Sequence, residues 1–114
     1  METGECIFCK IVRKQIPAEM VWEADAVVAF KDIHPKAEIH LLIVPKKHLA
    51  TLRDLSEDDR FLVGEIVRAA NQIMSEAHLG RKDYRLIANC GKGAGQAVFH
   101  VHFHLLAGRM FHFG

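Results

Sequence analysis

The chain has 114 residues, half of them hydrophobic and a quarter charged, with a formal net charge of +1 at pH 7. This length fits one globular domain over residues 1–114 and leaves no room for a second. The charge is nearly balanced and no basic stripe is present, so the electrostatic footprint of a nucleic-acid-binding protein is missing. No apolar run reaches the roughly 20 residues of a membrane span, and the N-terminus lacks the basic and apolar regions of a signal peptide. We therefore expect a cytoplasmic protein with no membrane partner.

The first part of the chain predicts a short helix followed by two strands. Apolar residues recur at helical spacing within residues 6–15, and Pro17 ends that helix. Residues 26–32 and 38–44 are apolar and rich in β-branched side chains, and residues 34–37 between them are typical of a turn. We expect these two strands to be adjacent and antiparallel.

The second part predicts a long helix and two more strands. Ser56 and Asp59 resemble a capping box, and apolar residues then recur at helical spacing up to Gly80. Residues 84–89 and the segment after the glycine-rich loop, residues 98–107, are typical of strands. Together these elements predict an α+β fold: an antiparallel sheet of about five strands with one long and one short helix, both on one face.

The cysteines indicate a site rather than a disulfide framework. Cys6 and Cys9 form a Cys-x-x-Cys pair, whereas Cys90 has no partner by spacing and is expected to be a free thiol. In a reducing compartment such a pair is more typical of metal binding or redox chemistry than of a structural disulfide. A redox motif would need a thioredoxin-like βαβ context, which the sequence does not predict. Two unligated thiols in the core are the other alternative.

Three histidines occupy alternate positions of the closing strand. Alternate side chains share one face of a strand about 6.6 Å apart, so His100, His102 and His104 are expected in a row. Each imidazole carries two nitrogens that need partners, so three in register are costly unless a ligand or metal satisfies them. The pattern predicts either a bound zinc ion or a neutral imidazole that attacks an electrophile such as phosphorus.

The segment from Asn89 to Leu106 closely resembles the histidine triad family, whose signature is His-φ-His-φ-His-φ-φ with φ apolar. Further landmarks occur in family order: Cys-Ile-Phe-Cys-Lys-Ile-Val, Ala-Phe-Lys-Asp-Ile, Ile-Val-Pro-Lys-Lys-His-Leu and the closing Gly-Arg. The resemblance covers nearly the whole chain. The short length and the ending Leu-Leu-Ala-Gly-Arg resemble the branch of histidine triad nucleotide-binding proteins, which are purine nucleoside phosphoramidases.

This resemblance implies a hydrolase that cleaves the P–N bond of nucleoside 5′-phosphoramidates, with adenosine as the expected nucleoside. His102 would attack the α-phosphorus and form a nucleotidyl-histidine, which water would hydrolyse to AMP after the amine has left. His104 would donate to a phosphate oxygen or to the leaving group, and His100 completes the catalytic set. An imidazole with an ordinary pKa of about 6.5 is mostly neutral at pH 7 and so is available as a nucleophile.

The resemblance also implies where the nucleotide binds. Asp32 matches the carboxylate that accepts hydrogen bonds from the ribose hydroxyls, with an ordinary turn aspartate as the alternative. The phosphate would lie against the loop of residues 91–95, whose glycines permit close approach of backbone N–H groups. The matching phosphate positions are Asn89, Gly95, Gln96 and Ala97. The positions that match the enclosure of the base, some of which could equally be ordinary core, are Ile7, Phe8, Ile11, Phe30, Ile33 and Leu42.

A structural zinc ion is the cofactor that the resemblance implies. Bacterial-type members bind zinc through the N-terminal Cys-x-x-Cys, a strand histidine and the first histidine of the triad. The corresponding residues here are Cys6, Cys9, His40 and His100. A Cys₂His₂ set is complete for a closed tetrahedral site, so this zinc would join the N-terminal helix to the sheet and not catalyse. A catalytic zinc on the three histidines of the triad is the alternative. The remaining histidines are expected to be solvated: His34, His48, His78 and His112.

Family members of this size pair as two-fold homodimers with a continuous sheet, so we expect a homodimer here. Gly64 in the long helix indicates either close approach of another backbone or a simply tolerated glycine. Ala97 replaces a serine that is frequent in the phosphoramidases, and the tail Met-Phe-His-Phe-Gly replaces a frequent Trp-Pro-Pro, so the leaving group is left open. Two other functions stay open: hydrolysis of dinucleoside polyphosphates or adenylyl conjugates by the same nucleophile, and nucleotide binding in an interaction protein with incidental hydrolysis.

Overall fold

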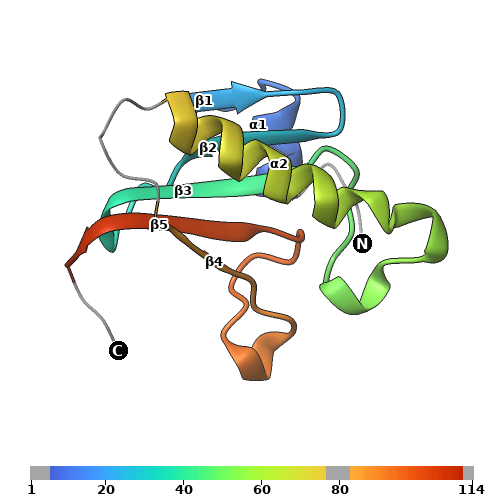
Figure 1. Ribbon diagram of the computed structural model, residues 1–114. Coiled ribbons are helices and arrows are strands. Elements are labelled where there is room, and N and C mark those ends of the chain that lie inside the picture. The colour runs from blue at the N-terminus through green and yellow to red at the C-terminus, as the bar shows by residue number, and fades with distance from the viewer. Residues whose placement is uncertain (1–5, 77–82, 112–114) are drawn as a thin grey trace.

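The computed structural model describes residues 6–76 and 83–111, and these form one antiparallel sheet in the order β1-β2-β3-β5-β4 (Figure 1). The strands are β1 Met20–Glu23, β2 Val27–Lys31, β3 Ala37–Pro45, β4 Arg85–Ile87 and β5 Phe103–Met110. The helices are α1 Ile7–Val12 and α2 Phe61–Glu76, with short 3₁₀ turns at Leu52–Asp54, Glu57–Asp59 and Lys92–Ala94. The predicted α+β fold, with about five strands, one short helix and one long helix, is confirmed. Three positions with sequence-based expectations lie outside the described residues: His78, Gly80 and His112.

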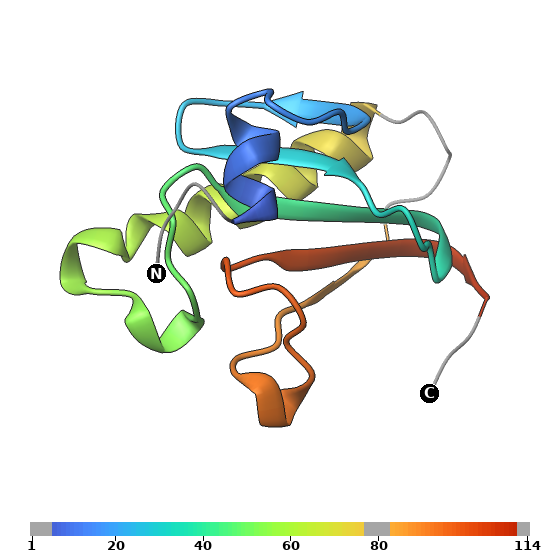
Figure 2. The same ribbon diagram turned by 180° about the vertical axis from the view of Figure 1, so that it is seen from behind.

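The two helices cover opposite faces of the sheet, which differs from the prediction that both share one face. In Figure 2, α1 lies in front of the sheet and α2 lies behind it. Alternate residues of β2 and β3 explain this arrangement, because Ala29 and Ile43 pack against α2 whereas Val28 and Val44 pack against α1. The two central strands are apolar without alternation, a pattern typical of strands that are buried on both faces. No helix among the described residues is both long and apolar enough to cross a bilayer.

The edge strand β1 was not predicted from the sequence. It has only four residues, and its side chains alternate between half-buried and exposed. It pairs with β2 through a register irregularity between Met20 and Trp22. A strand this short, at a sheet edge, carries too little apolar periodicity to be recognised from sequence alone.

The predicted capping box is present and fixes the loop between β3 and α2. Both the backbone N–H and the hydroxyl of Ser56 donate to Asp59 Oδ2 at 3.0 Å. The other oxygen of this buried carboxylate accepts from Lys47 Nζ at 2.6 Å. Asp59 therefore ties the start of α2 to the segment that follows β3, and this segment carries His48 into the site described below.

The last strand starts later than predicted, at Phe103 instead of residue 98. It pairs with β3 so that Leu42 lies opposite His104. The preceding segment is held by a different contact, because the N–H of Val101 donates to the Leu49 carbonyl at 2.7 Å. His100 and His102 therefore precede the strand, and the three histidines do not form the straight row that an uninterrupted strand would give.

Candidate active site

A cavity of about 770 Å³ lies between α1, the loop after β2, and the β4–β5 connection. It is lined by apolar side chains on the α1 side and by histidines, an aspartate and loop backbone on the other. Twelve of the residues predicted from sequence for the catalytic and nucleotide sites line it: His102, His104, Asp32, Ile33, Phe30, Phe8, Ile7, Ile11, Leu42, Asn89, Gly95 and Ala97. The structure thus brings together segments from both ends of the chain that the sequence could only associate by resemblance.

His102 is held in one tautomer. Its Nδ1 lies 2.7 Å from the carbonyl oxygen of His100, and a carbonyl can only accept, so Nδ1 carries the proton. The other nitrogen, Nε2, then keeps its lone pair. The ring of Phe8 meets the imidazole edge-on with centroids 5.2 Å apart, which restricts its rotation. In the neutral form of the ring, this geometry presents a fixed Nε2 lone pair at the cavity.

The side chain of His100 does not reach the cavity, which corrects its prediction as a catalytic side chain. It is completely buried, and its Nε2 donates to the carbonyl oxygen of Pro45 at 2.8 Å. The pKa of His100 is lowered to about 4, first by burial and then by the nearby His48 and His102, against the opposing hydrogen bond to Pro45. The ring is therefore neutral at pH 7, with the lone pair of Nδ1 directed toward the cysteine pair. His100 serves the cavity through its carbonyl group.

Three further atoms that could ligate a metal ion lie around that lone pair. His100 Nδ1 lies 3.3 Å from Cys6 Sγ and 3.6 Å from Cys9 Sγ. His48 Nδ1 lies 3.3 Å from Cys9 Sγ and 3.2 Å from His100 Nδ1. All four ligand atoms lie within 4.8 Å of one another. The cluster is therefore a Cys₂His₂ set formed by Cys6, Cys9, His48 and His100.

His40, the predicted fourth ligand, does not lie in this cluster, and the strand register explains why. β3 and β5 are antiparallel, with His40 opposite Leu106 and Leu42 opposite His104. Continuing this register places residue 100 beyond the end of β3, six positions along the strand from His40, or about 20 Å. The loop that follows β3 reaches that point instead, so His48 occupies the place expected for His40. His48 is half-buried, which also corrects its prediction as a solvated histidine.

The Cys₂His₂ set fits zinc. Bond lengths of about 2.3 Å to sulfur and 2.0–2.1 Å to nitrogen require ligand atoms roughly 3.3 to 3.8 Å apart in a tetrahedron. The four separations given above, 3.2 to 3.6 Å, agree with these edges. Burial, together with the neighbouring Cys6, raises the pKa of the Cys9 thiol to about 11, because this pocket offers a thiolate little positive charge. A bound cation would supply that charge.

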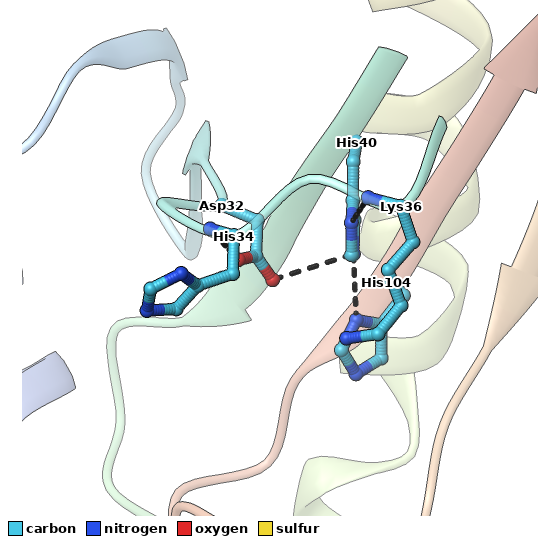
Figure 3. Close-up of polar contacts among 5 residues, drawn as sticks. All are labelled: Asp32, His34, Lys36, His40 and His104. Atoms are coloured by element: carbon cyan, nitrogen blue, oxygen red, sulfur yellow. Dashed lines mark hydrogen bonds and ion pairs between the residues drawn. The ribbon is translucent and has the colours of Figure 1, made fainter. Parts of the chain in front are cut away.

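A second polar cluster lies at the other end of the triad (Figure 3). His40 Nε2 lies 3.0 Å from His104 Nδ1 and 3.3 Å from Asp32 Oδ2. His40 Nδ1 accepts from the backbone N–H of Lys36 at 3.0 Å, and Asp32 Oδ1 accepts from the N–H of His34 at 2.7 Å. Burial lowers the pKa of His40, and burial with the neighbouring His102 and His40 lowers that of His104 to about 4. Both rings are neutral at pH 7.

The glycine-rich loop is built differently from the predicted phosphate cradle. Gly91 and Gly95 each have a φ of 93°, which an L side chain rarely adopts, so glycine is required at both positions. The N–H groups of residues 94, 95 and 96 donate to carbonyls within the loop, so they do not point to a ligand. The loop therefore holds its own shape, and contacts to an anion would come from side chains and backbone beside it.

Gln96 also differs from its prediction as a nucleotide-binding residue. Its side chain is buried and does not line the cavity. Oε1 accepts from the N–H of Gly91 at 2.8 Å, while Nε2 donates to the carbonyls of Ala50 at 2.7 Å and Val98 at 3.0 Å. Gln96 thus ties the loop to the segment after His48.

Sequence reasoning missed several side chains that line the cavity beyond the triad. Lys36, Arg85, Leu106 and Met110 line it on the side of β4 and the end of β5. The alternation of β5 was a usable signal, because Leu106 shares its strand face with His104. The others depend on which strands are neighbours, and the sequence did not show that β4 lies at the sheet edge next to β5.

Comparisons with known proteins agree with this fold and site. The family model described as Scavenger mRNA decapping enzyme C-term binding matches residues 5–112. The chain is 41% identical to an uncharacterized HIT-like protein of Synechocystis, covering 94% of this chain and 93% of that protein. It is 40% identical to the purine nucleoside phosphoramidase of Escherichia coli K12, covering 92% and 88%.

Solved structures show the same resemblance. A histidine triad protein from Clostridium difficile superposes with a TM-score of 0.91 at 41% identity, covering 100% of this chain and 99% of the other. A HIT family hydrolase from Legionella pneumophila gives a TM-score of 0.87 at 44% identity, covering 96% and 97%. With the triad geometry described above, these matches show that the chain belongs to the histidine triad (HIT) family.

Proposed function

We propose that this protein is a hydrolase that cleaves nucleoside 5′-phosphoramidates, with an adenine nucleotide as the expected substrate. The observation that carries the proposal is the locked tautomer of His102, whose Nδ1–H donates to the His100 carbonyl and whose Nε2 lone pair lies at the cavity. The 40% identity to the purine nucleoside phosphoramidase of Escherichia coli supports this substrate class.

The proposed reaction has two steps. In the first, the Nε2 lone pair of His102 forms a bond to the α-phosphorus while the P–N bond breaks; its electron pair goes to the amine nitrogen, which takes up a proton and leaves. In the second, water attacks the phosphorus, the P–Nε2 pair returns to His102, and the proton released by water balances the first step. The positive charge on the intermediate ring is stabilised because Nδ1–H still donates to the His100 carbonyl.

The cavity offers separate regions for each part of a nucleotide. Phe8, Ile11, Phe30 and Leu42 give an apolar end for the base. Asp32 is available for the ribose hydroxyls, because a carboxylate accepts two hydrogen bonds at once. His104 has its Nδ1 against His40, so its Nε2 is the nitrogen that would donate to a phosphoryl oxygen or to the leaving nitrogen. Asn89, Gly95 and Ala97 line the intervening part.

Zinc is proposed as a structural cofactor held by Cys6, Cys9, His48 and His100. Four protein ligands close a tetrahedral site, so the ion would have no open position for water or substrate and would supply cross-linking rather than chemistry. It would join α1 to the segment that carries His102, since Cys9 lies in α1 and His100 is two residues from the nucleophile. Its binding would rigidify one wall of the cavity.

A homodimer is proposed as the assembly. Val63 and Val67, one turn apart on α2, are exposed, and a Cβ placed on Gly64 beside them would meet nothing within 4 Å. Within the described part of a single chain, therefore, no backbone approaches Gly64. An apolar strip beside a glycine on a helix suits close packing of a second copy, and two-fold dimers are the commonest closed assembly.

The proposed function is tested by AMP release from adenosine 5′-phosphoramidate, by wild type and by His102→Asn. Removing the nucleophile is expected to reduce release by a factor of about a hundred or more, while folding, zinc content and AMP binding stay unchanged. Wild-type protein quenched in alkaline denaturant during turnover, which preserves an acid-labile P–N bond, is expected to carry the nucleotidyl group on His102. Wild-type turnover by His102→Asn, or no release by wild type, would overturn the proposal.

A second substrate class uses the same nucleophile and differs in the leaving group. Diadenosine polyphosphates would expel a nucleotide instead of an amine. The cavity favours neither by volume alone, but Lys36 and Arg85 are among its lining residues and would suit an anionic leaving group. Comparing kcat/KM for diadenosine tetraphosphate and adenosine 5′-phosphoramidate separates the two classes. A binding-only protein would bind AMP and turn over neither.

A further inference from the structure

His40 lies between the proposed ribose-binding carboxylate and the proposed phosphate-side histidine. The residue is 4% exposed, and Figure 3 shows its Nε2 directed toward both Asp32 and His104. The two separations are 3.3 Å to Asp32 Oδ2 and 3.0 Å to His104 Nδ1. One ring nitrogen can carry only one proton, so these two acceptors share it.

The backbone fixes where that proton is. The N–H of Lys36 donates to His40 Nδ1 at 3.0 Å, so Nδ1 must be unprotonated. A neutral imidazole with an unprotonated Nδ1 carries its proton on Nε2. His40 is therefore an N–H donor toward Asp32 and His104.

The same contact argues against a cation in this cluster. Asp32, His40 and His104 place three ligating atoms within 4.8 Å of one another. A metal on His40 Nε2 would need the lone pair of that nitrogen while Nδ1 still accepts from Lys36, and this would require an imidazolate. The neutral donor form satisfies every contact without that cost.

His104 depends on the shared proton. When His40 Nε2–H donates to His104 Nδ1, that nitrogen must be unprotonated, so His104 carries its proton on Nε2. When the proton of His40 instead donates to Asp32, His104 is released to adopt the Nδ1–H form, whose Nε2 lone pair would face the phosphate oxygens. Only the first arrangement makes His104 a donor at the cavity.

We propose that His40 couples ribose recognition at Asp32 to the donor tautomer of His104, so that the ribose diol is needed for turnover and not only for binding. In the free protein the carboxylate competes for the His40 proton because charged acceptors form the stronger hydrogen bonds. Two ribose hydroxyls donating to Asp32 satisfy that carboxylate and leave the proton to His104. His40 is thus a positioning residue that acts through His104. The proposed coupling rests on the proposed function.

The kinetic test compares adenosine 5′-phosphoramidate with its 2′,3′-dideoxy analogue. In wild type, loss of the diol is expected to lower kcat about tenfold in addition to raising KM. The reason is that His104 then spends part of the time without the Nε2–H that would donate to the transition state. His40→Leu removes the donor and His40→Gln keeps an amide donor with two hydrogens, one for each acceptor. Both variants lose the acceptor for the Lys36 N–H, so they form a matched pair.

His40→Leu is expected to have a kcat about tenfold below wild type on the ribose substrate, and His40→Gln to stay near wild type. In both, kcat should no longer depend on the diol. The proposal is overturned if the diol changes only KM in wild type, or if folded His40→Leu keeps the wild-type ratio of kcat values between the two substrates.

A measurement without turnover separates this inference from the proposed function. Nitrogen-15 chemical shifts of the His104 ring are recorded in wild type with AMP and with 2′,3′-dideoxy-AMP. AMP is expected to give the Nε2–H tautomer alone, and the dideoxy nucleotide a mixture. Identical shifts with both ligands would overturn the coupling, even in a protein that hydrolyses no phosphoramidate. A wild type that shows the shift difference but releases no AMP would overturn the proposed function alone.

Discussion

The Nδ1 atoms of His48 and His100 lie 3.2 Å apart, although they belong to segments separated by 52 positions in the chain. The Nε2–H of His100 is already donated to Pro45, so its Nδ1 presents a lone pair to His48 and to the two cysteines. A cation would stabilise this convergence of lone pairs and thiols, and its fourth ligand would then be a loop histidine.

His48→Ala is accordingly expected to lose zinc, whereas His40→Ala, at the position predicted from sequence, should retain it. Losing one ligand of a closed site leaves an incomplete set around a buried neutral histidine, so we expect a loss of several kcal/mol in unfolding free energy. Metal content by mass spectrometry and thermal unfolding of both variants test this. Equal zinc content in His48→Ala and wild type would show that His48 is not a ligand.

The lowered pKa of His104 predicts a loss of stability in mild acid. Its pKa is about 4 in the folded protein, because of burial first and then of His102 and His40, against about 6.5 when unfolded. The unfolded state therefore binds a proton first, and stability should fall as the pH drops from about 6.5 toward about 4, by about 1 to 2 kcal/mol at pH 5.

His104→Gln removes this contribution, so its unfolding free energy should depend less on pH. Urea unfolding of wild type and variant at about pH 7.5 and about pH 5 gives the comparison, with zinc content recorded at both. Both proteins keep the Cys₂His₂ set, so loss of zinc affects them alike. Parallel changes in the two proteins would contradict the assignment to His104.

Gly95→Ala should destabilise the loop at the cavity. Gly95 has a φ of 93°, and an L side chain in a left-handed conformation costs about 1 to 2 kcal/mol. Gly93→Ala is the matched control, because Gly93 has no such φ and a Cβ there meets nothing within 4 Å. Chemical unfolding should show a lower free energy of unfolding for Gly95→Ala only. An equal effect of both substitutions would show that φ is not the cause.

Gly64→Ala separates the two explanations of this helix glycine. In an isolated chain the substitution should raise helix stability by about 1 kcal/mol, since the position is open. If a second copy packs closely there, as proposed, the added methyl group should weaken association by about tenfold or more. Sedimentation equilibrium of Gly64→Ala and of Ser75→Ala, an exposed position on the same helix, measures this. Unchanged association would place any dimer interface elsewhere.

The sequence by itself determined most of the elements and the chemical character of the site. Helical periodicity located α1 and α2, and apolar runs rich in β-branched side chains located β2 and β3, because such runs are typical of buried strands. The alternating histidines and the Cys-x-x-Cys pair indicated the side chains that we propose for catalysis and for metal binding. Resemblance supplied the cavity residues, and twelve of those predicted line it.

Tertiary structure alone decided which of these side chains meet. The antiparallel register of β3 and β5 sends His40 to His104 and leaves the place beside His100 to His48. Likewise, the N–H groups of the glycine-rich loop are used inside the loop, and Gln96 is used to anchor it. Residue type and local spacing fix what a side chain can do, but its partner depends on strand order and register, which arise from packing across the whole sheet.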